Sequence, residues 1–117
     1  MPYTKESALW APQSYLDASP KQLKEACNGC GTEGWKGDLV PETIWGLNIN
    51  ECCCIHDWMY NEGTTPKDKE RADTTFLNNM LRLVNQSDWW ILRLLRRRRA
   101  LKYYEAVNQF GGPAFYG

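Results

Sequence analysis

The sequence predicts a mainly α-helical domain with little or no β-structure, and two observations support this prediction. Apolar residues recur at intervals of three and four in long stretches, as they do on the buried face of a helix. No stretch alternates apolar and polar residues in the way a half-buried strand does. A length of 117 residues is typical of one compact domain, so residues 1–117 are expected to share a single core.

The first two expected helices are marked by their ends. Ser19 followed by Pro20 is a typical helix start, because serine caps backbone N–H groups and proline fits the first turn; a short helix is expected over PKQLKEA. A second helix is expected from about Asn50 until Gly63 ends it. One face of this helix should carry Ile49, Cys52, Cys53, His56 and Tyr60.

Two further helices are expected after this turn. Thr65 and Pro66 repeat the cap-and-proline start. The helix that follows has an apolar side that should pack against the preceding helix, formed by Ala72, Phe76, Met80, Leu83 and Val84. A basic and aromatic C-terminal helix is expected over about residues 87–110, where Gly111-Gly112-Pro113 ends it.

His56 is the only histidine, and the hairpin places it level with Asp73. His56 lies eight residues before Thr64 and Asp73 lies nine after it, so an antiparallel pair brings them together. Asp73 shares a face with Phe76, and a buried carboxylate needs a partner. An Asp that holds one imidazole nitrogen leaves the other to take a proton, as in a general-base dyad. A structural pair that only joins two helices is the alternative.

A glycine-rich loop precedes the second helix. It contains five glycines between Cys27 and Ile49. Asp57 projects about 100° away from His56 around the helix, toward a different neighbour. If the loop folds over this helix, its carbonyls and Asp57 form an all-oxygen site of the kind that calcium prefers. An ordinary surface loop and a solvent-exposed Asp57 are the alternatives.

The five cysteines allow two structural hypotheses. Cys27, Cys30 and the triplet Cys52, Cys53 and Cys54 can form two disulfides with one thiol left over, or a four-thiolate zinc site. Adjacent helical residues diverge by about 100°, so the triplet supplies zinc ligands poorly and disulfides are favoured. A zinc-stabilised nucleic-acid-binding module that is not an enzyme remains the alternative from a different class.

Three segments resemble the secreted phospholipases A2. Residues 52–60, CCCIHDWMY, resemble the family's C-C-x-x-H-D-x-x-Y signature. Residues 30–34, CGTEG, are similar to its calcium loop, although Glu33 stands where the family usually has glycine, and residues 71–77, RADTTFL, are similar to its second catalytic helix. The short hairpin resembles the minimal phospholipase domains of parvovirus capsid proteins and of phage or bacterial relatives. The match covers about residues 27–81.

The resemblance implies calcium-dependent hydrolysis of the sn-2 ester of phospholipids. In that case His56 deprotonates the attacking water, Asp73 orients the imidazole, and Tyr60 hydrogen-bonds Asp73. Asp57 would hold Ca²⁺ with loop carbonyls, and the Gly31 N–H would stabilise the oxyanion. The implied loop ligands are near Gly29, Gly31, and Glu33 or Gly34. The family pattern also implies a Cys30–Cys53 disulfide. An inactive relative that only binds membranes is a further alternative.

Charge is segregated along the chain. Residues 1–88 carry eight basic and thirteen acidic residues, a net of −5, whereas residues 89–117 carry six and one, a net of +5. The basic end mixes aromatic and cationic side chains, as membrane-interface helices do: Trp89, Trp90, Arg96, Arg97, Arg98 and Arg99. We expect a phospholipid bilayer or micelle as its partner, with nucleic-acid contact and a solvated helix end as alternatives.

The sequence offers no targeting segment. No apolar stretch approaches the roughly 18 residues of a membrane span, and the start MPYTKESALW lacks the apolar run of a secretory signal. If Met1 is the true start, the expectation is a cytoplasmic protein that leaves by host-cell lysis or in a virus particle. A signal removed earlier would leave the same sequence.

Overall fold

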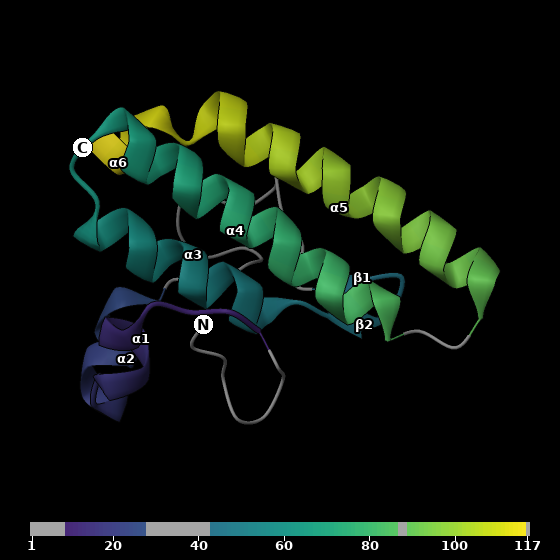
Figure 1. Cartoon of the computed structure of the whole chain (residues 1–117), viewed down its shortest axis with the longest axis horizontal. Coiled ribbons are helices and arrows are strands. Elements are labelled where there is room, and N and C mark those ends of the chain that lie inside the picture. Colours follow the sequence, from purple (N-terminus) through teal and green to yellow (C-terminus); the bar gives the residue numbers. More distant parts are fainter. Residues whose placement is uncertain (1–8, 28–42, 87–88, 117) are drawn as a thin grey trace.

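The computed structural model describes residues 9–27, 43–86 and 89–116, and within them the predicted mainly α-helical fold is confirmed (Figure 1). One short antiparallel hairpin accompanies the helices. In chain order the elements are α1 (Gln13–Asp17), α2 (Pro20–Ala26), β1 (Thr43–Ile44), β2 (Leu47–Asn48), α3 (Asn50–Glu62), α4 (Pro66–Asn85), α5 (Trp90–Phe110) and α6 (Gly112–Tyr116).

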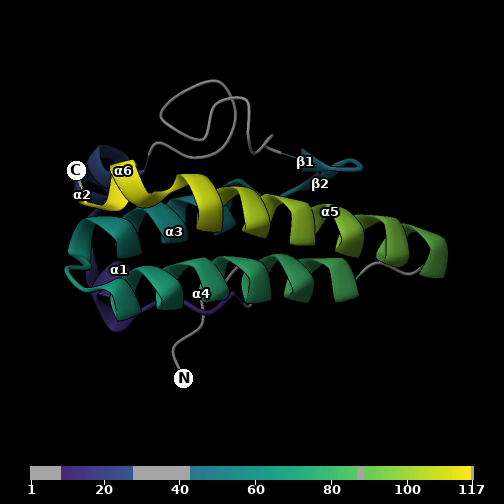
Figure 2. The same cartoon turned by 90° about the horizontal axis from the view of Figure 1, so that it is seen from above.

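Helices α3 and α4 form the predicted antiparallel hairpin. The Thr65 side chain accepts a bond from the Asp68 N–H, while the Asp68 carboxylate accepts one from the Thr65 N–H, so two N–H groups at the start of α4 are satisfied. Helix α4 packs against both α3 and α5 (Figures 1 and 2). The faces predicted to be apolar supply much of the core, including Ile49, Cys52, Ala72, Phe76, Met80 and Val84.

The N-terminal segment crosses α4 and is tied to it by one buried amide. The Asn79 side chain accepts a bond from the Trp10 N–H and donates one to the Trp10 carbonyl, both at 2.9 Å. The predicted short helix is α2, and Ser19 caps it as expected. A disulfide between Cys27, at the end of α2, and Cys54 then joins this region to α3.

The hairpin of β1 and β2 turns at Trp45 and Gly46. Both residues have positive φ, 47° and 82°, as a two-residue turn matched to the twist of its strands requires. A tryptophan rarely adopts this conformation. The Arg96 side chain of α5 donates a 2.8 Å hydrogen bond to the Trp45 carbonyl and so holds the turn against the helix.

The C-terminal end differs from the expectation that the helical structure stops at residues 111–113. Helix α5 does end at Phe110, but the chain forms a further short helix, α6, which packs against α3 and α5. The buried Phe115 ring meets the Tyr60 ring at a centroid distance of 5.2 Å. This apolar contact explains why the chain turns back. In the described part of the chain, no helix combines the length and apolar character needed to cross a bilayer.

Candidate active site

His56 and Asp73 meet in the interior between α3 and α4. The His56 Nε2 atom lies 2.7 Å from the Asp73 Oδ1 atom, so the predicted contact is present. Both side chains are buried, with exposed fractions of 1% and 0%. The imidazole also packs between the rings of Tyr60 and Phe76, at centroid distances of 4.2 and 4.9 Å. The ring is therefore held in one orientation by a carboxylate at its edge and by aromatic neighbours.

Asp73 has two further donors. The Tyr60 hydroxyl donates to Oδ1 at 2.6 Å, which is the contact that the family resemblance implies. The Lys69 ammonium donates to Oδ2 at 2.8 Å. Lys69 is not among the predicted site residues, although it lies four residues before Asp73 on the same helix, a spacing that brings opposite charges together.

These donors keep Asp73 ionised. Burial alone would raise the pKa of Asp73, but the hydrogen bonds from His56, Lys69 and Tyr60 outweigh it and hold the pKa below its ordinary value. Burial and the bond to Asp73 raise the pKa of Tyr60 well above its usual range. An ionised carboxylate only accepts, so His56 Nε2 carries the hydrogen and Nδ1 is the basic nitrogen of the neutral ring.

Asp57 follows His56 on α3 and is also buried, with 4% of its surface exposed. Its charge contributes to the raised pKa of Tyr60, after burial and the hydrogen bond and charge of Asp73. The other predicted calcium ligands, Gly29, Gly31, Glu33 and Gly34, lie outside the described residues. Within the described residues no group of three or more His, Cys, Asp or Glu side chains could hold a metal. The described part of the chain thus supplies one predicted ligand, Asp57.

The described cysteines agree with the favoured hypothesis of disulfides with one thiol left over, and the implied Cys30–Cys53 pairing stays a prediction. Cys53 is disulfide-bonded, and its implied partner Cys30 lies outside the described residues. The Cys27–Cys54 disulfide was not foreseen. Cys52 is a fully buried thiol. The end of α2 is therefore joined covalently to α3 two residues before His56.

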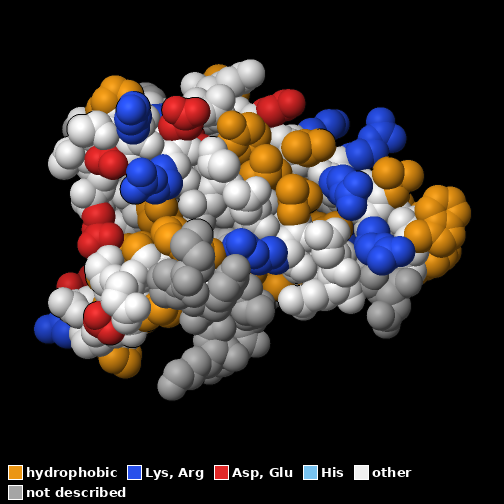
Figure 3. Space-filling model, in the orientation of Figure 1, with side chains coloured by type: hydrophobic (Ala, Val, Ile, Leu, Met, Phe, Trp, Pro, Cys, Tyr) orange, Lys and Arg blue, Asp and Glu red, His pale blue; other side chains and the backbone are white. Residues whose placement is uncertain are grey.

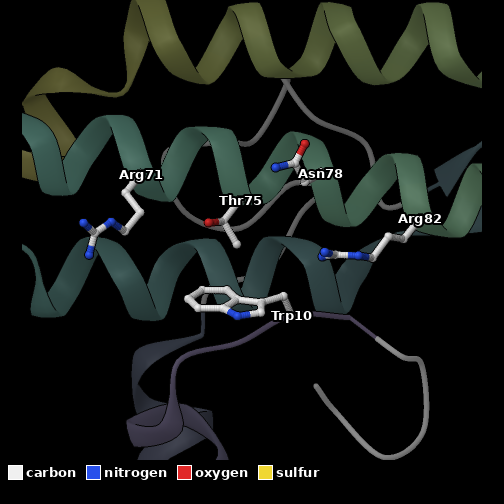
Figure 4. A pocket seen from close by; sticks show the side chains of 5 residues that line it. All are labelled: Trp10, Arg71, Thr75, Asn78 and Arg82. Atoms are coloured by element: carbon white, nitrogen blue, oxygen red, sulfur yellow. The ribbon is translucent and has the colours of Figure 1, made fainter. Parts of the chain in front are cut away.

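A cavity of about 390 Å³ lies on another face of α4 (Figure 4). Its α4 residues stand about 140° to 200° around the helix from Asp73. The lining residues are Trp10, Arg71, Thr75, Asn78 and Arg82. This hollow is separate from the His56–Asp73 pair, so the candidate active site is identified by its chemistry and not by this cavity.

The predicted membrane-facing residues divide into two groups. Trp89 and Trp90 are exposed, with fractions of 55% and 63%, and Arg97, Arg98 and Arg99 are exposed as well. Arg96 differs from them: it is only partly exposed, and its guanidinium donates a hydrogen bond to the Trp45 carbonyl. Consecutive helical residues point about 100° apart, so four adjacent arginines cannot all share one face.

No protein-family model, curated protein or solved structure matches this chain.

Proposed function

We propose that this chain is a calcium-dependent hydrolase of the phospholipase A2 type, which cleaves the sn-2 ester of phospholipids at a membrane surface. The observation that carries the proposal is the 2.7 Å contact between His56 and the buried, ionised Asp73. The sequence around His56, residues 52–60, resembles the signature of the secreted phospholipases A2. The same carboxylate also accepts from Tyr60 and Lys69, so both of its oxygens are held in place beside the imidazole.

The chemistry follows from the assignment of the two ring nitrogens. Nδ1 of His56 takes a proton from a water as the water oxygen attacks the ester carbonyl, and Asp73 stabilises the imidazolium that forms. The tetrahedral species then breaks its bond to the alcohol oxygen, which takes the proton back from Nδ1. A fatty acid and a lysophospholipid leave, and His56 is neutral again. Asp73 and Tyr60 act here as positioning residues.

Among the described residues Asp57 is the one proposed calcium ligand. A carboxylate is the hard oxygen ligand that calcium prefers, and Asp57 is buried beside His56. Asp57 would hold the ion together with loop carbonyls. A bound calcium ion would supply positive charge for the phosphate and for the developing oxyanion.

The disulfides favour this proposal over the zinc-stabilised nucleic-acid module. A four-thiolate site needs reduced sulfurs, but Cys27 and Cys54 are bonded to each other and Cys53 is also oxidised. The inactive membrane binder differs from the hydrolase only in turnover, so an activity assay separates these two.

The decisive experiment measures release of sn-2 fatty acid from mixed phospholipid vesicles. We expect hydrolysis in calcium, loss of hydrolysis in EDTA, and loss in His56→Gln and Asp57→Asn. Asp17→Asn removes an exposed carboxylate from α1 and is the matched control, with activity unchanged. Equal hydrolysis with EDTA, or in His56→Gln, would contradict the mechanism. Vesicle binding by the wild type without hydrolysis would identify the inactive binder.

A further inference from the structure

Helix α5 has two apolar faces, and only one of them is used in the fold. The inward face buries Ala100, Tyr103 and Val107. The outward face exposes Trp90, Leu94 and Leu101, with exposed fractions of 63%, 50% and 43%. Their spacing of four and seven residues places these three side chains on one line along the helix. Large apolar side chains gathered in this way on a surface mark a contact site more often than scattered ones do.

Basic residues flank this apolar line. From helix geometry Arg93 and Arg97 lie on one side of it, and Arg98 and Lys102 lie on the other. All four are exposed, and none forms a salt bridge within the described part of the chain. Figure 3 shows hydrophobic and basic side chains side by side toward the end of the molecule where α5 begins. The surface therefore offers positive charge and apolar area together.

A shallow cavity of about 330 Å³ opens on the same surface, between the end of α4 and the start of α5. It is lined by Asn85, Trp90, Arg93, Leu94 and Arg97. This volume lies at the lower end of the range of small-molecule sites. Two guanidinium groups with an amide can hold phosphate oxygens, and Trp90 and Leu94 can cover an apolar body.

We infer that this outward face of α5 is a binding site for anionic phospholipid. The lipid phosphate lies between Arg93 and Arg97, while Trp90, Leu94 and Leu101 enter the boundary between headgroups and acyl chains. The inference deepens the proposed function, because it names the surface through which the hydrolase meets its substrate. A second copy of the chain is a poorer occupant, since two such faces would oppose like charges. A nucleic acid would leave Leu94 and Leu101 in water.

The test measures binding apart from hydrolysis, so all variants carry His56→Gln. Sedimentation measures the fraction of protein bound to vesicles. One set of vesicles contains phosphatidylglycerol, which is anionic, and the other contains only phosphatidylcholine. We expect saturable binding to the anionic vesicles that weakens with salt. Arg93→Gln/Arg97→Gln should weaken it about thirtyfold, since each basic residue near an anionic surface contributes about fivefold. Lys21→Gln/Lys24→Gln removes two exposed charges from α2 and is the matched control, with binding within twofold of the parent.

Further probes identify the ligand. Trp90→Ala should weaken vesicle binding about tenfold, and soluble glycerol phosphate should compete poorly because it lacks acyl chains. Equal binding by the arginine variant and its parent would overturn the inference, as would an equal loss in the lysine control. Tighter binding of a single-stranded oligonucleotide than of vesicles would overturn it in favour of nucleic acid. If the wild-type chain, which retains His56, binds lipid but does not hydrolyse it, the proposed function is refuted while the binding site stands.

Discussion

The interior between α3 and α4 and the outer face of α5 use similar side chains in opposite ways. Both contain aromatic rings beside charges. In the interior, Tyr60 is 5% exposed and the Asp73 carboxylate receives three hydrogen bonds. On the outer face, Trp90 is 63% exposed and Arg97 forms no salt bridge in the described residues. Pairing and burial fix the position of an atom, whereas exposure leaves area and charge available to another molecule.

The difference predicts how the two regions respond to mutation. Changes in the interior should alter turnover and stability, because each removed group leaves a buried partner unsatisfied. Changes on α5 should alter lipid affinity while stability stays constant. The following experiments test that separation.

The largest effect is expected from Asp73→Asn. An amide is neutral, so it accepts more weakly than a carboxylate from His56 and Tyr60. Its NH2 group can also donate to Nε2, which favours the tautomer with the hydrogen on Nδ1. We expect hydrolysis to fall about 10⁴-fold, as for the equivalent change in other His–Asp pairs, while vesicle binding stays within twofold. Turnover on vesicles and partition onto them should be measured on the same preparation. A parallel loss of lipid binding would show that the two regions are not separate.

Loss of the Cys27–Cys54 disulfide should have the next largest effect. The bridge closes a segment with a sequence separation of 27, for which loop-closure entropy predicts about 3.5 kcal/mol of stabilisation. Cys27→Ser/Cys54→Ser should lower the free energy of unfolding by about that amount in urea. Treatment with a reductant should affect the wild type more than this variant. An unchanged urea midpoint would show that packing alone anchors α2 to α3.

Gly111 offers a narrower test, because it lies against the Tyr60 hydroxyl. A Cβ atom at this position would overlap that oxygen and the Val107 carbonyl, whereas a Cβ at Gly112 would meet no atom within 4 Å. Gly111→Ala should displace Tyr60, lower stability by about 2 kcal/mol and slow hydrolysis about tenfold. Gly112→Ala is the matched control, with both quantities near those of the wild type. Equal stability and equal hydrolysis rates in the two variants would show that Tyr60 is not a positioning residue.

Acid should weaken the interior pair in a defined window. The pKa of Asp73 is lowered in the folded chain, so its stabilising contribution is complete above the unfolded value of about 3.9 and is lost as the pH falls through the folded value. Unfolding measured between about pH 5 and 2 should therefore show a steeper loss of stability in the wild type than in Asp73→Asn. Identical slopes would show that Asp73 does not contribute to acid sensitivity.

The smallest effect on folding is expected from Arg97→Gln. This side chain is exposed and makes no salt bridge in the described residues, so the free energy of unfolding should change by less than about 0.5 kcal/mol. Thermal unfolding without lipid checks this expectation. A larger loss would indicate that the outer face of α5 contributes to the fold.

The sequence predicts the helices and the His56–Asp73 pair because both depend on the spacing of residues close together in the chain. Caps and proline mark the start of α4, and the length of the connection sets the level at which His56 meets Asp73. Tyr60 follows from the family resemblance, and its bond to Asp73 is present. These features depend on spacing within one hairpin.

The features that the sequence does not predict depend on distant packing. The cysteine triplet points in three directions, and only the position of α2 determines that Cys54 meets Cys27. Helix geometry likewise keeps the four arginines from sharing one face, but only the position of the turn at Trp45 determines that Arg96 bonds it. The close approach of Gly111 to Tyr60 joins segments that are about fifty residues apart.

Lys69 connects the two regions through a single nitrogen. Its ammonium donates to the Asp73 carboxylate and, at 3.1 Å, to the Asn108 carbonyl near the end of α5. A tilt or slide of α5 against α4 must therefore stretch one of these bonds or carry the lysine with it. Asp73, which orients His56, is thus linked through Lys69 to α5, the helix that carries Trp90 and Arg93 at its other end.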